Sequence, residues 1–325
     1  MPGLSPEAVG QCCDDVLERV AIAVVGKRDE LRMVLAGILA GGHVLLEDMP
    51  GLGKTLTARS FAQTLGLGFR RLQFTPDLLP ADVTGGYIYN QRLEEFEFRP
   101  GPIFTNLLLA DEINRTPPRT QAALLEAMQE RQVTVEGNTA PLEQPFHVLA
   151  TANPIEYEGT YPLPEAQLDR FLLRISFGYL NAEEESEILE RRMLRHQEDQ
   201  VLDPVCDGAT LLEMQRTVEN TAVESSLRDY MVALNAATRE HPHVLVGSSP
   251  RGALALLLAS RATAAIDGRG FVTPDDVKHV AVAALAHRLT LRPETYLHRI
   301  TGSQVVLSVL DEVPVPSSWA MPEFA

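Results

Sequence analysis

A short glycine-rich stretch carries the residue types that bind phosphate groups. Gly51 and Gly53 let the backbone approach an anion closely, so that successive backbone N–H groups can surround it. Lys54 would bring a positive charge to the β- and γ-phosphates, and Thr55 would offer its hydroxyl group to a magnesium ion. The stretch therefore predicts a loop that binds ATP with Mg²⁺. The alternative is an ordinary turn between a strand and a helix.

The sequence on either side of this loop supports phosphate binding. An apolar run at 43–47 predicts a buried strand, and 55–65 has the pattern of a helix, whose N-terminus favours anions. One position departs from the usual pattern, because Asp48 stands where such loops have their first glycine, six residues before the lysine. Pro50 and Gly51 can still form the turn, so we expect the loop to keep its function.

A second candidate is a pair of carboxylates at the end of an apolar run. The run 107–110 predicts a strand, and Asp111 and Glu112 follow it directly. In an open sheet of parallel strands, ligands lie at the carboxyl ends of the strands. Asp111 would then join the magnesium shell, and Glu112 would polarise the water that attacks the γ-phosphate. Many strands end in acids that only cap a helix, so this assignment depends on the phosphate loop upstream.

Three further polar residues each have a functional and a structural interpretation. Asn153 follows another apolar run and could contact the γ-phosphate, or it could belong to an Asn-Pro turn. Arg170 could stabilise charge on the γ-phosphate, also from a neighbouring subunit, or it could form a surface ion pair with Asp169. Arg251 follows a predicted N-cap, Ser249, and the helix dipole disfavours a cation there unless phosphate is bound. Spacing alone does not decide between these interpretations.

The elements that must position these residues alternate between strands and helices, which indicates an α/β core with a parallel sheet. The expected strands are 43–47, 107–110, 146–151 and 171–177. The expected helices are 13–25, 29–40, 55–65 and 120–131, the last with Thr120 as its N-cap. Two surface hairpins are predicted at 83–99 and 132–146.

The second part of the chain has a different pattern, because strands become scarce. A charge-rich helix is expected at 181–199, where Glu187 and Arg191 have i,i+4 spacing. Further helices are expected at 227–239, 250–267 and 273–287. We therefore expect two domains. The first is a core at 1–178 with an N-terminal helix, and the second is a helical domain at 179–325 that ends in a tail around Trp319.

Composition argues against several classes of protein. The chain of 325 residues has a formal net charge of −16, whereas general nucleic-acid binding needs a basic surface. Three cysteines cannot build a disulfide framework, and no signal peptide or apolar run of membrane-span length is present. We therefore expect a cytoplasmic protein without a stable nucleic-acid partner. His241 and His243 have a spacing that metals can use, although a loop explains the pair better.

Together these pieces resemble the AAA+ ATPases and, within them, the MoxR family, over nearly the whole chain. The resemblance is carried by the phosphate loop at 47–55, LLLADEINR at 107–115, TQAALLEAMQERQV at 120–133, ATANPIEYEGTYPLPEAQLDR at 150–170 and GSSPRG at 247–252. The run from 153 to 171 is its most specific part. The resemblance implies an α/β fold with a P-loop AAA+ core, a parallel sheet with flanking helices, and then a smaller all-helical lid domain.

The resemblance also implies a role for each motif. Asn153 matches sensor 1, Arg170 the arginine finger that acts in trans, and Arg251 the sensor 2 residue that would act in cis from the lid. The residues implied in catalysis are Glu112, Asn153, Arg170 and Arg251. The residues implied in nucleotide binding are Val25, Gly26, Pro50, Gly51, Leu52, Gly53, Lys54, Thr55, Leu56 and Asp111, of which Thr55 and Asp111 would also bind Mg²⁺.

The function that the resemblance implies is ATP hydrolysis used to remodel, assemble or activate another protein, as a chaperone does. The site would lie between subunits of a ring, expected to be a hexamer, and the hairpins would face partners or a pore. A separate protein with a von Willebrand factor A domain is a candidate partner. Two alternatives remain. A ring-shaped nucleic-acid motor is disfavoured by the acidic balance, and an ATP-dependent scaffold without turnover is disfavoured by Glu112 and Arg170.

Overall fold

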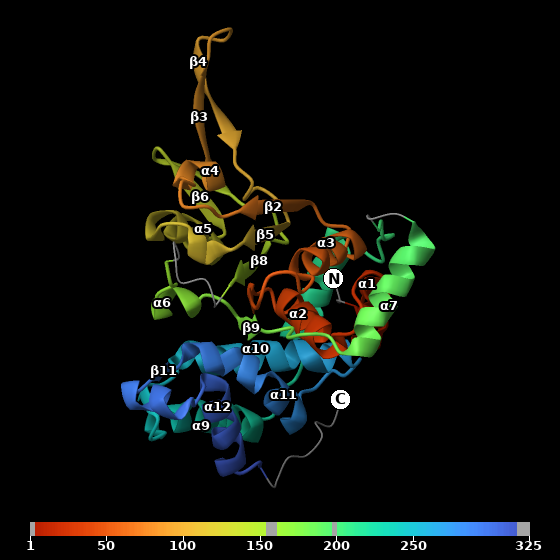
Figure 1. Ribbon diagram of the computed structural model, residues 1–325, viewed down its shortest axis with the longest axis vertical. Coiled ribbons are helices and arrows are strands. Elements are labelled where there is room, and N and C mark those ends of the chain that lie inside the picture. The colour runs from red at the N-terminus through yellow and green to blue at the C-terminus, as the bar shows by residue number, and fades with distance from the viewer. Residues whose placement is uncertain (1–3, 154–160, 197–199, 317–325) are drawn as a thin grey trace.

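A parallel β-sheet with helices around it forms the centre of the molecule (Figure 1). The computed structural model describes residues 4–153, 161–196 and 200–316. Within these residues the sheet has five strands in the order β2-β5-β8-β1-β9, and every neighbouring pair is parallel. The strands are β1 Val44–Glu47, β2 Phe69–Gln73, β5 Leu107–Asp111, β8 His147–Ala152 and β9 Leu173–Ile175. The predicted α/β fold is confirmed.

The position of each strand in the sheet explains its composition. Strands β5 and β8 lie in the interior of the sheet and are buried along their whole lengths, as expected where helices cover both faces. Strand β2 lies at an edge and exposes Arg70 and Arg71, and the sequence patterns did not predict it. An edge strand with one open side does not need a continuous apolar run, so its signal is weak.

Helices before and between the strands cover the sheet. They are α1 Pro6–Ala23, α2 Arg28–Leu39, α3 Lys54–Thr64, α4 Pro80–Thr84, η1 Ile113–Arg115, α5 Pro118–Glu130 and α6 Glu165–Leu168. The predicted N-cap of α5 is wrong, because this helix begins at Pro118, which needs no N–H partner at a first helical position. Thr120 is buried instead, and its hydroxyl donates to the Leu78 carbonyl at 2.8 Å.

In the described ranges 179–196 and 200–316, the C-terminal part is helical with one two-stranded ribbon. Its elements are α7 Ala182–Arg195, α8 Gly208–Glu219, α9 Ser225–Glu240, β10 Val244–Val246, α10 Pro250–Ile266, α11 Pro274–Leu285, η2 Ala286–Arg288, β11 Thr290–Leu291, η3 Pro293–His298 and α12 Gly302–Glu312. Helices α8 and α12 were not predicted. The missed signals were their caps, since Asp207 and Thr301 accept from backbone N–H groups at the starts of these helices.

Both predicted hairpins form. β3 Gly85–Asn90 pairs with β4 Glu95–Pro100, and this hairpin extends away from the rest of the molecule (Figure 1). Cross-strand aromatic pairs, Tyr87 with Phe98 and Tyr89 with Phe96, stiffen it, with ring centroids 5.4 and 5.3 Å apart. β6 Gln132–Val135 pairs with β7 Asn138–Pro141. That either hairpin faces a pore stays a prediction.

The helical C-terminal part packs closely on the core. Helix α10 contacts α1 and α2, and α11 contacts strand β9. One hydrophobic cluster therefore runs from α1 through the sheet to α12. The division into two domains at 178/179 stays a prediction, and the predicted tail around Trp319 lies outside the described residues. None of the helices in the described ranges is both long and apolar enough to cross a membrane.

Candidate active site

The phosphate loop follows β1 and ends at the first residue of α3. Gly51 and Gly53 have φ values of +84° and +81°, a left-handed conformation that glycine adopts without strain. Open space lies in front of both residues, because a Cβ atom placed on either would have no neighbour within 4 Å. The N-terminus of α3 faces this space, so the loop is shaped to receive an anion.

Asp48, which replaces the usual glycine, fastens the base of the loop. Its buried carboxylate accepts hydrogen bonds from the N–H groups of Phe177 and Gly178, the latter at 2.9 Å, and from the Ser176 hydroxyl at 3.1 Å. These residues begin the segment 176–180, which leads from β9 to α7. The substitution therefore adds a structural connection and leaves the front of the loop open.

A hydrogen bond to the backbone holds the Lys54 side chain against the phosphate loop. Its Nζ donates to the Asp48 carbonyl at 2.6 Å. Burial lowers the pKa of Lys54, while the nearby carboxylates of Asp48, Asp111 and Glu112 oppose that shift. The ammonium group thus lies among acids, where an incoming phosphate could pair with it.

The family resemblance predicts that the segment with Val25 and Gly26 lies near the adenine, and this segment reaches the same region. Val25 is buried, and Gly26 has a φ value of +65°. Lys27 Nζ donates to the Tyr179 carbonyl at 2.8 Å. The segment 176–180 therefore connects Asp48 at the loop to the predicted adenine segment.

The carboxyl ends of β5 and β8 bring Asp111 and Glu112 together with Thr151. The Thr151 hydroxyl donates to Asp111 Oδ1 at 2.6 Å and accepts from the Glu112 N–H at 2.8 Å. The second oxygen of Asp111, Oδ2, accepts from Arg71 Nε and Nη2 at 3.0 and 2.6 Å. Sequence reasoning missed Arg71 because it lies on the unpredicted edge strand.

Glu112 has a strained backbone and a restrained side chain. Its φ and ψ values of 57° and 50° are left-handed, which is costly for a residue other than glycine and is common at functional sites. Its Oε2 accepts from Gln73 Nε2 at 2.7 Å and pairs with Arg115 Nε at 2.9 Å. Gln73, like Arg71, was missed with strand β2. The carboxylate is therefore turned toward these two partners.

Asn153 lies directly after β8 at the same edge of the sheet. It is buried, and its carbonyl accepts from Asn114 Nδ2 at 3.0 Å. The following residues 154–160, which include the predicted Asn-Pro turn, lie outside the described residues. The edge thus carries the phosphate loop, both acids and this asparagine on neighbouring strands.

The residues at this edge fit a nucleotide with a divalent cation. A hydroxyl from Thr55 and a carboxylate from Asp111 are hard oxygen ligands of the kind Mg²⁺ prefers. The glycine loop leaves room for phosphates, and Lys54 supplies positive charge. No cluster of three His, Cys, Asp or Glu side chains suited to a metal occurs in the described part of the chain. His241 and His243 lie side by side in a turn before β10, where the His243 N–H donates to His241 Nδ1 at 3.3 Å.

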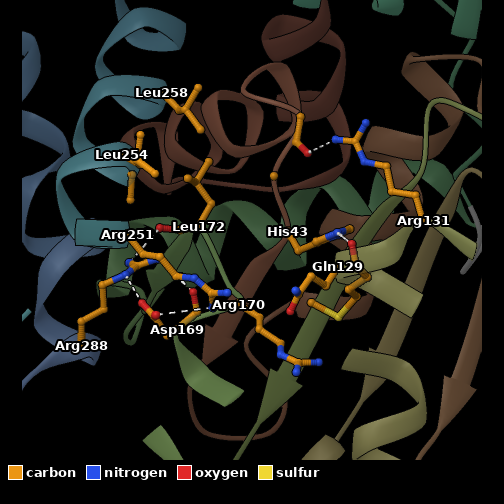
Figure 2. Close-up of a pocket in the computed structure, with 14 residues that line it drawn as sticks. His43, Gln129, Arg131, Asp169, Arg170, Leu172, Arg251, Leu254, Leu258 and Arg288 are labelled. Carbon is orange, nitrogen blue, oxygen red and sulfur yellow. Dashed lines mark hydrogen bonds and ion pairs between the residues drawn. The ribbon is translucent and has the colours of Figure 1, made fainter. Parts of the chain in front are cut away.

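The two predicted catalytic arginines, Arg170 and Arg251, lie at the amino ends of the strands, opposite the ends that carry the phosphate loop. Arg170 precedes β9 and lines a cavity of about 260 Å³ together with Arg131, Arg251 and Arg288 (Figure 2). Gly42 and His43, which precede β1, form part of its wall. The amino ends of β1 and β9 therefore border this cavity, whereas the phosphate loop follows the carboxyl end of β1.

The structure shows which residues surround these two arginines. Arg251 does begin helix α10 behind the N-cap Ser249, as predicted. It lies beside Asp169, at 3.5 Å, in the cavity at the amino ends of β1 and β9, and its action in cis stays a prediction. A surface ion pair between Asp169 and Arg170 is absent from the described residues. The Asp169 carboxylate pairs instead with Arg288 at 2.8 Å and with Arg251.

Comparison with known proteins agrees with this geometry. Residues 43–173 match the model of the ATPase family associated with various cellular activities (AAA), and residues 236–307 match an AAA lid domain. The fold and the site thus define an AAA+ ATPase. The chain is 49% identical to the uncharacterized protein YeaC of Bacillus subtilis, over 92% of this chain and 93% of the relative.

Two other similarities narrow the identity. The chain is 44% identical to the chaperone MoxR1 of Mycobacterium tuberculosis, over 92% of this chain and 81% of that protein. A crystal structure of a candidate ATPase from Cytophaga hutchinsonii superposes with a TM-score of 0.88 at 41% identity, covering 95% of this chain and 96% of the other. The chain belongs to the MoxR family of AAA+ ATPases.

Proposed function

We propose that this protein forms a ring in which each ATP lies between two subunits, and that hydrolysis remodels or activates a partner protein. One observation supports the shared site. The phosphate loop lies at the carboxyl ends of the strands of the sheet, whereas the cavity lined by Arg170 and Arg251 lies at their amino ends. One chain cannot bring both to the same phosphate without large rearrangement. In a closed head-to-tail ring, the cavity of one subunit would face the loop of the next.

Each residue of this composite site has a distinct task in the proposal. Lys54 would bind the β- and γ-phosphates, and Thr55 and Asp111 would hold Mg²⁺, which would neutralise charge on the phosphates. Glu112 leaves Gln73 and Arg115 to polarise the attacking water, which Asn153 helps to orient. Arg170 and Arg251 of the neighbouring subunit stabilise the charge that develops on the γ-phosphate. Both arginines thus act in trans.

A mixing experiment tests the shared site. Arg170→Ala and Lys54→Ala chains should each be inactive alone, although Arg170→Ala should still bind ATP. After equimolar mixing, roughly a quarter of wild-type turnover should return, because half of the intact loops then face an intact arginine in a head-to-tail ring. Activity that stays absent in mixtures shown to form mixed rings would overturn the arrangement.

The proposed work on a partner protein is supported by the family of the chain and by the chaperone name of one relative. We propose a hexameric ring in the cytoplasm, and a protein with a von Willebrand factor A domain as the first partner to test. Glu112→Gln protein loaded with ATP should retain a bound partner that wild-type protein releases. Turnover stimulated by DNA or RNA at physiological salt, with no effect of the partner, would instead favour a nucleic-acid motor.

A further inference from the structure

One arginine of the cavity differs from its neighbours in being almost fully enclosed. The Arg288 side chain, from η2, is 4% exposed, whereas that of Arg251 is 50% exposed. Figure 2 shows the guanidinium of Arg288 turned toward Asp169. Arg288 is therefore poorly placed to contact a ligand from a neighbouring subunit. Its charge is instead paired with Asp169 of the same chain.

The hydrogen bonds of Arg288 fasten the segment that carries Arg170. Its Nη2 donates to the Phe171 carbonyl at 2.7 Å and to the Asp169 carbonyl at 3.4 Å, so it binds the backbone on both sides of Arg170. Its Nη1 donates to the Leu172 carbonyl at 3.3 Å. These bonds connect the helical C-terminal part to the loop before β9, although the two segments are more than 100 residues apart in the sequence.

Asp169 extends the same connection to Arg251. Its Oδ1 accepts from Arg288 Nε at 2.8 Å. Its Oδ2 lies 3.5 Å from Arg251 Nη1 and accepts from the Ser249 hydroxyl, the N-cap of α10, at 3.4 Å. A single carboxylate therefore links the enclosed arginine to the start of the helix that presents Arg251.

We propose that Asp169 and Arg288 are positioning residues that hold Arg170 and Arg251 in one arrangement for a neighbouring subunit. This inference rests on the proposed function, in which both arginines act in trans. An enclosed ion pair is costly to separate, so the pair keeps the loop before β9 and the start of α10 together.

The proposal separates positioning from a role in stability alone. Asp169→Asn and Arg288→Gln remove the ion pair with little change in volume. Because the phosphate loop lies at the carboxyl ends of the strands, away from this ion pair, both variants should bind a fluorescent ATP analogue as wild type does. Their kcat should fall on the order of 10- to 100-fold with KM nearly unchanged, since small displacements of catalytic groups are costly. Arg261→Gln is the matched control, because Arg261 forms an ion pair with Glu219 elsewhere in the lid region.

Mixing distinguishes this inference from the function on which it rests. Arg288→Gln mixed with Lys54→Ala should regain turnover. In such a ring, the intact phosphate loop of an Arg288→Gln subunit can face the correctly held arginines of a Lys54→Ala subunit. Arg170→Ala mixed with Lys54→Ala is the reference. Rescue of the reference pair without rescue of Arg288→Gln, or wild-type kcat in Asp169→Asn, overturns only the positioning role. Failure of the reference pair overturns the shared site itself.

If Arg288→Gln does not fold, as judged by circular dichroism, Asp169→Asn carries the same test. It leaves every backbone bond of Arg288 in place and removes the carboxylate charge that connects Arg288 to Arg251. An unchanged kcat in a folded Asp169→Asn ring counts against the proposal.

Discussion

Arg71 and Asp111 are joined by two hydrogen bonds, because Nε and Nη2 of the arginine both donate to Oδ2 of the carboxylate, at 3.0 and 2.6 Å. The other oxygen of Asp111 accepts from the Thr151 hydroxyl. A divalent cation that binds Asp111 must therefore compete with Arg71 for Oδ2 or displace it. Since the Arg71 side chain is 51% exposed, the pair is accessible to such an exchange.

Arg71→Gln should make metal binding easier. Removing a partly exposed ion pair should lower the Mg²⁺ concentration for half-maximal ATPase activity about two- to fivefold. The measurement is a Mg²⁺ titration at saturating ATP, followed both by turnover and by fluorescence of a bound nucleotide analogue. Arg70→Gln is the matched control on the same strand. A higher Mg²⁺ requirement in Arg71→Gln would show that Arg71 supports the metal site.

Glu112→Gln should bind ATP and assemble, but its kcat for ATP hydrolysis should fall on the order of 100-fold or more, because only the group that polarises water is lost. Nucleotide affinity and ring size should match wild type in binding assays and light scattering. Glu240→Gln, at the exposed end of α9, controls for the loss of one charge. Normal hydrolysis by Glu112→Gln would remove Glu112 from the catalytic residues.

Asp48→Gly restores the usual glycine of phosphate loops but should weaken this protein. The carboxylate accepts from Ser176, Phe177 and Gly178, and its loss leaves these donors without their partner. We expect the free energy of unfolding to fall by about 1–3 kcal/mol. Asp48→Asn, which keeps one acceptor oxygen, should lie between the two. Urea unfolding of wild type, Asp48→Gly and Asp48→Asn measures these free energies. An Asp48→Gly protein as stable as wild type would contradict the structural role of Asp48.

Stability should fall in mild acid because of two buried histidines. Burial lowers the pKa of His43 to about 3 and that of His147 to about 4, and both imidazoles hydrogen-bond to backbone groups. Their pKa values in the unfolded chain are near 6.5, so the unfolded state binds more protons between about pH 4 and 6.5. The stabilisation is complete above pH 6.5 or so and is lost as pH falls toward the folded values.

The slope of stability against pH provides the measurement. Each histidine should contribute up to about 1.4 kcal/mol per pH unit in this window. Buried His287, whose pKa burial also lowers, adds to the effect. Urea unfolding between pH 7.5 and 5 should show a smaller slope in His147→Gln than in wild type.

The sequence by itself predicted which residues of the candidate site lie at the carboxyl ends of the strands. Apolar runs before Asp48, Asp111 and Asn153 marked buried strands, and parallel strands present their carboxyl ends at one edge. Local composition was enough for these residues because each follows its own strand directly. The glycines of the phosphate loop were equally readable, since their left-handed backbone depends on the residue type.

Tertiary structure alone decided which residues surround these groups. Arg71 and Gln73 reach Asp111 and Glu112 only because β2 pairs with β5, and an exposed edge strand leaves little pattern in the sequence. The position of Arg251 also lay beyond the sequence. Whether α10 faces the phosphate loop or the opposite edge depends on how the lid packs against α1, α2 and β9, which is a sum of long-range contacts that no local motif records.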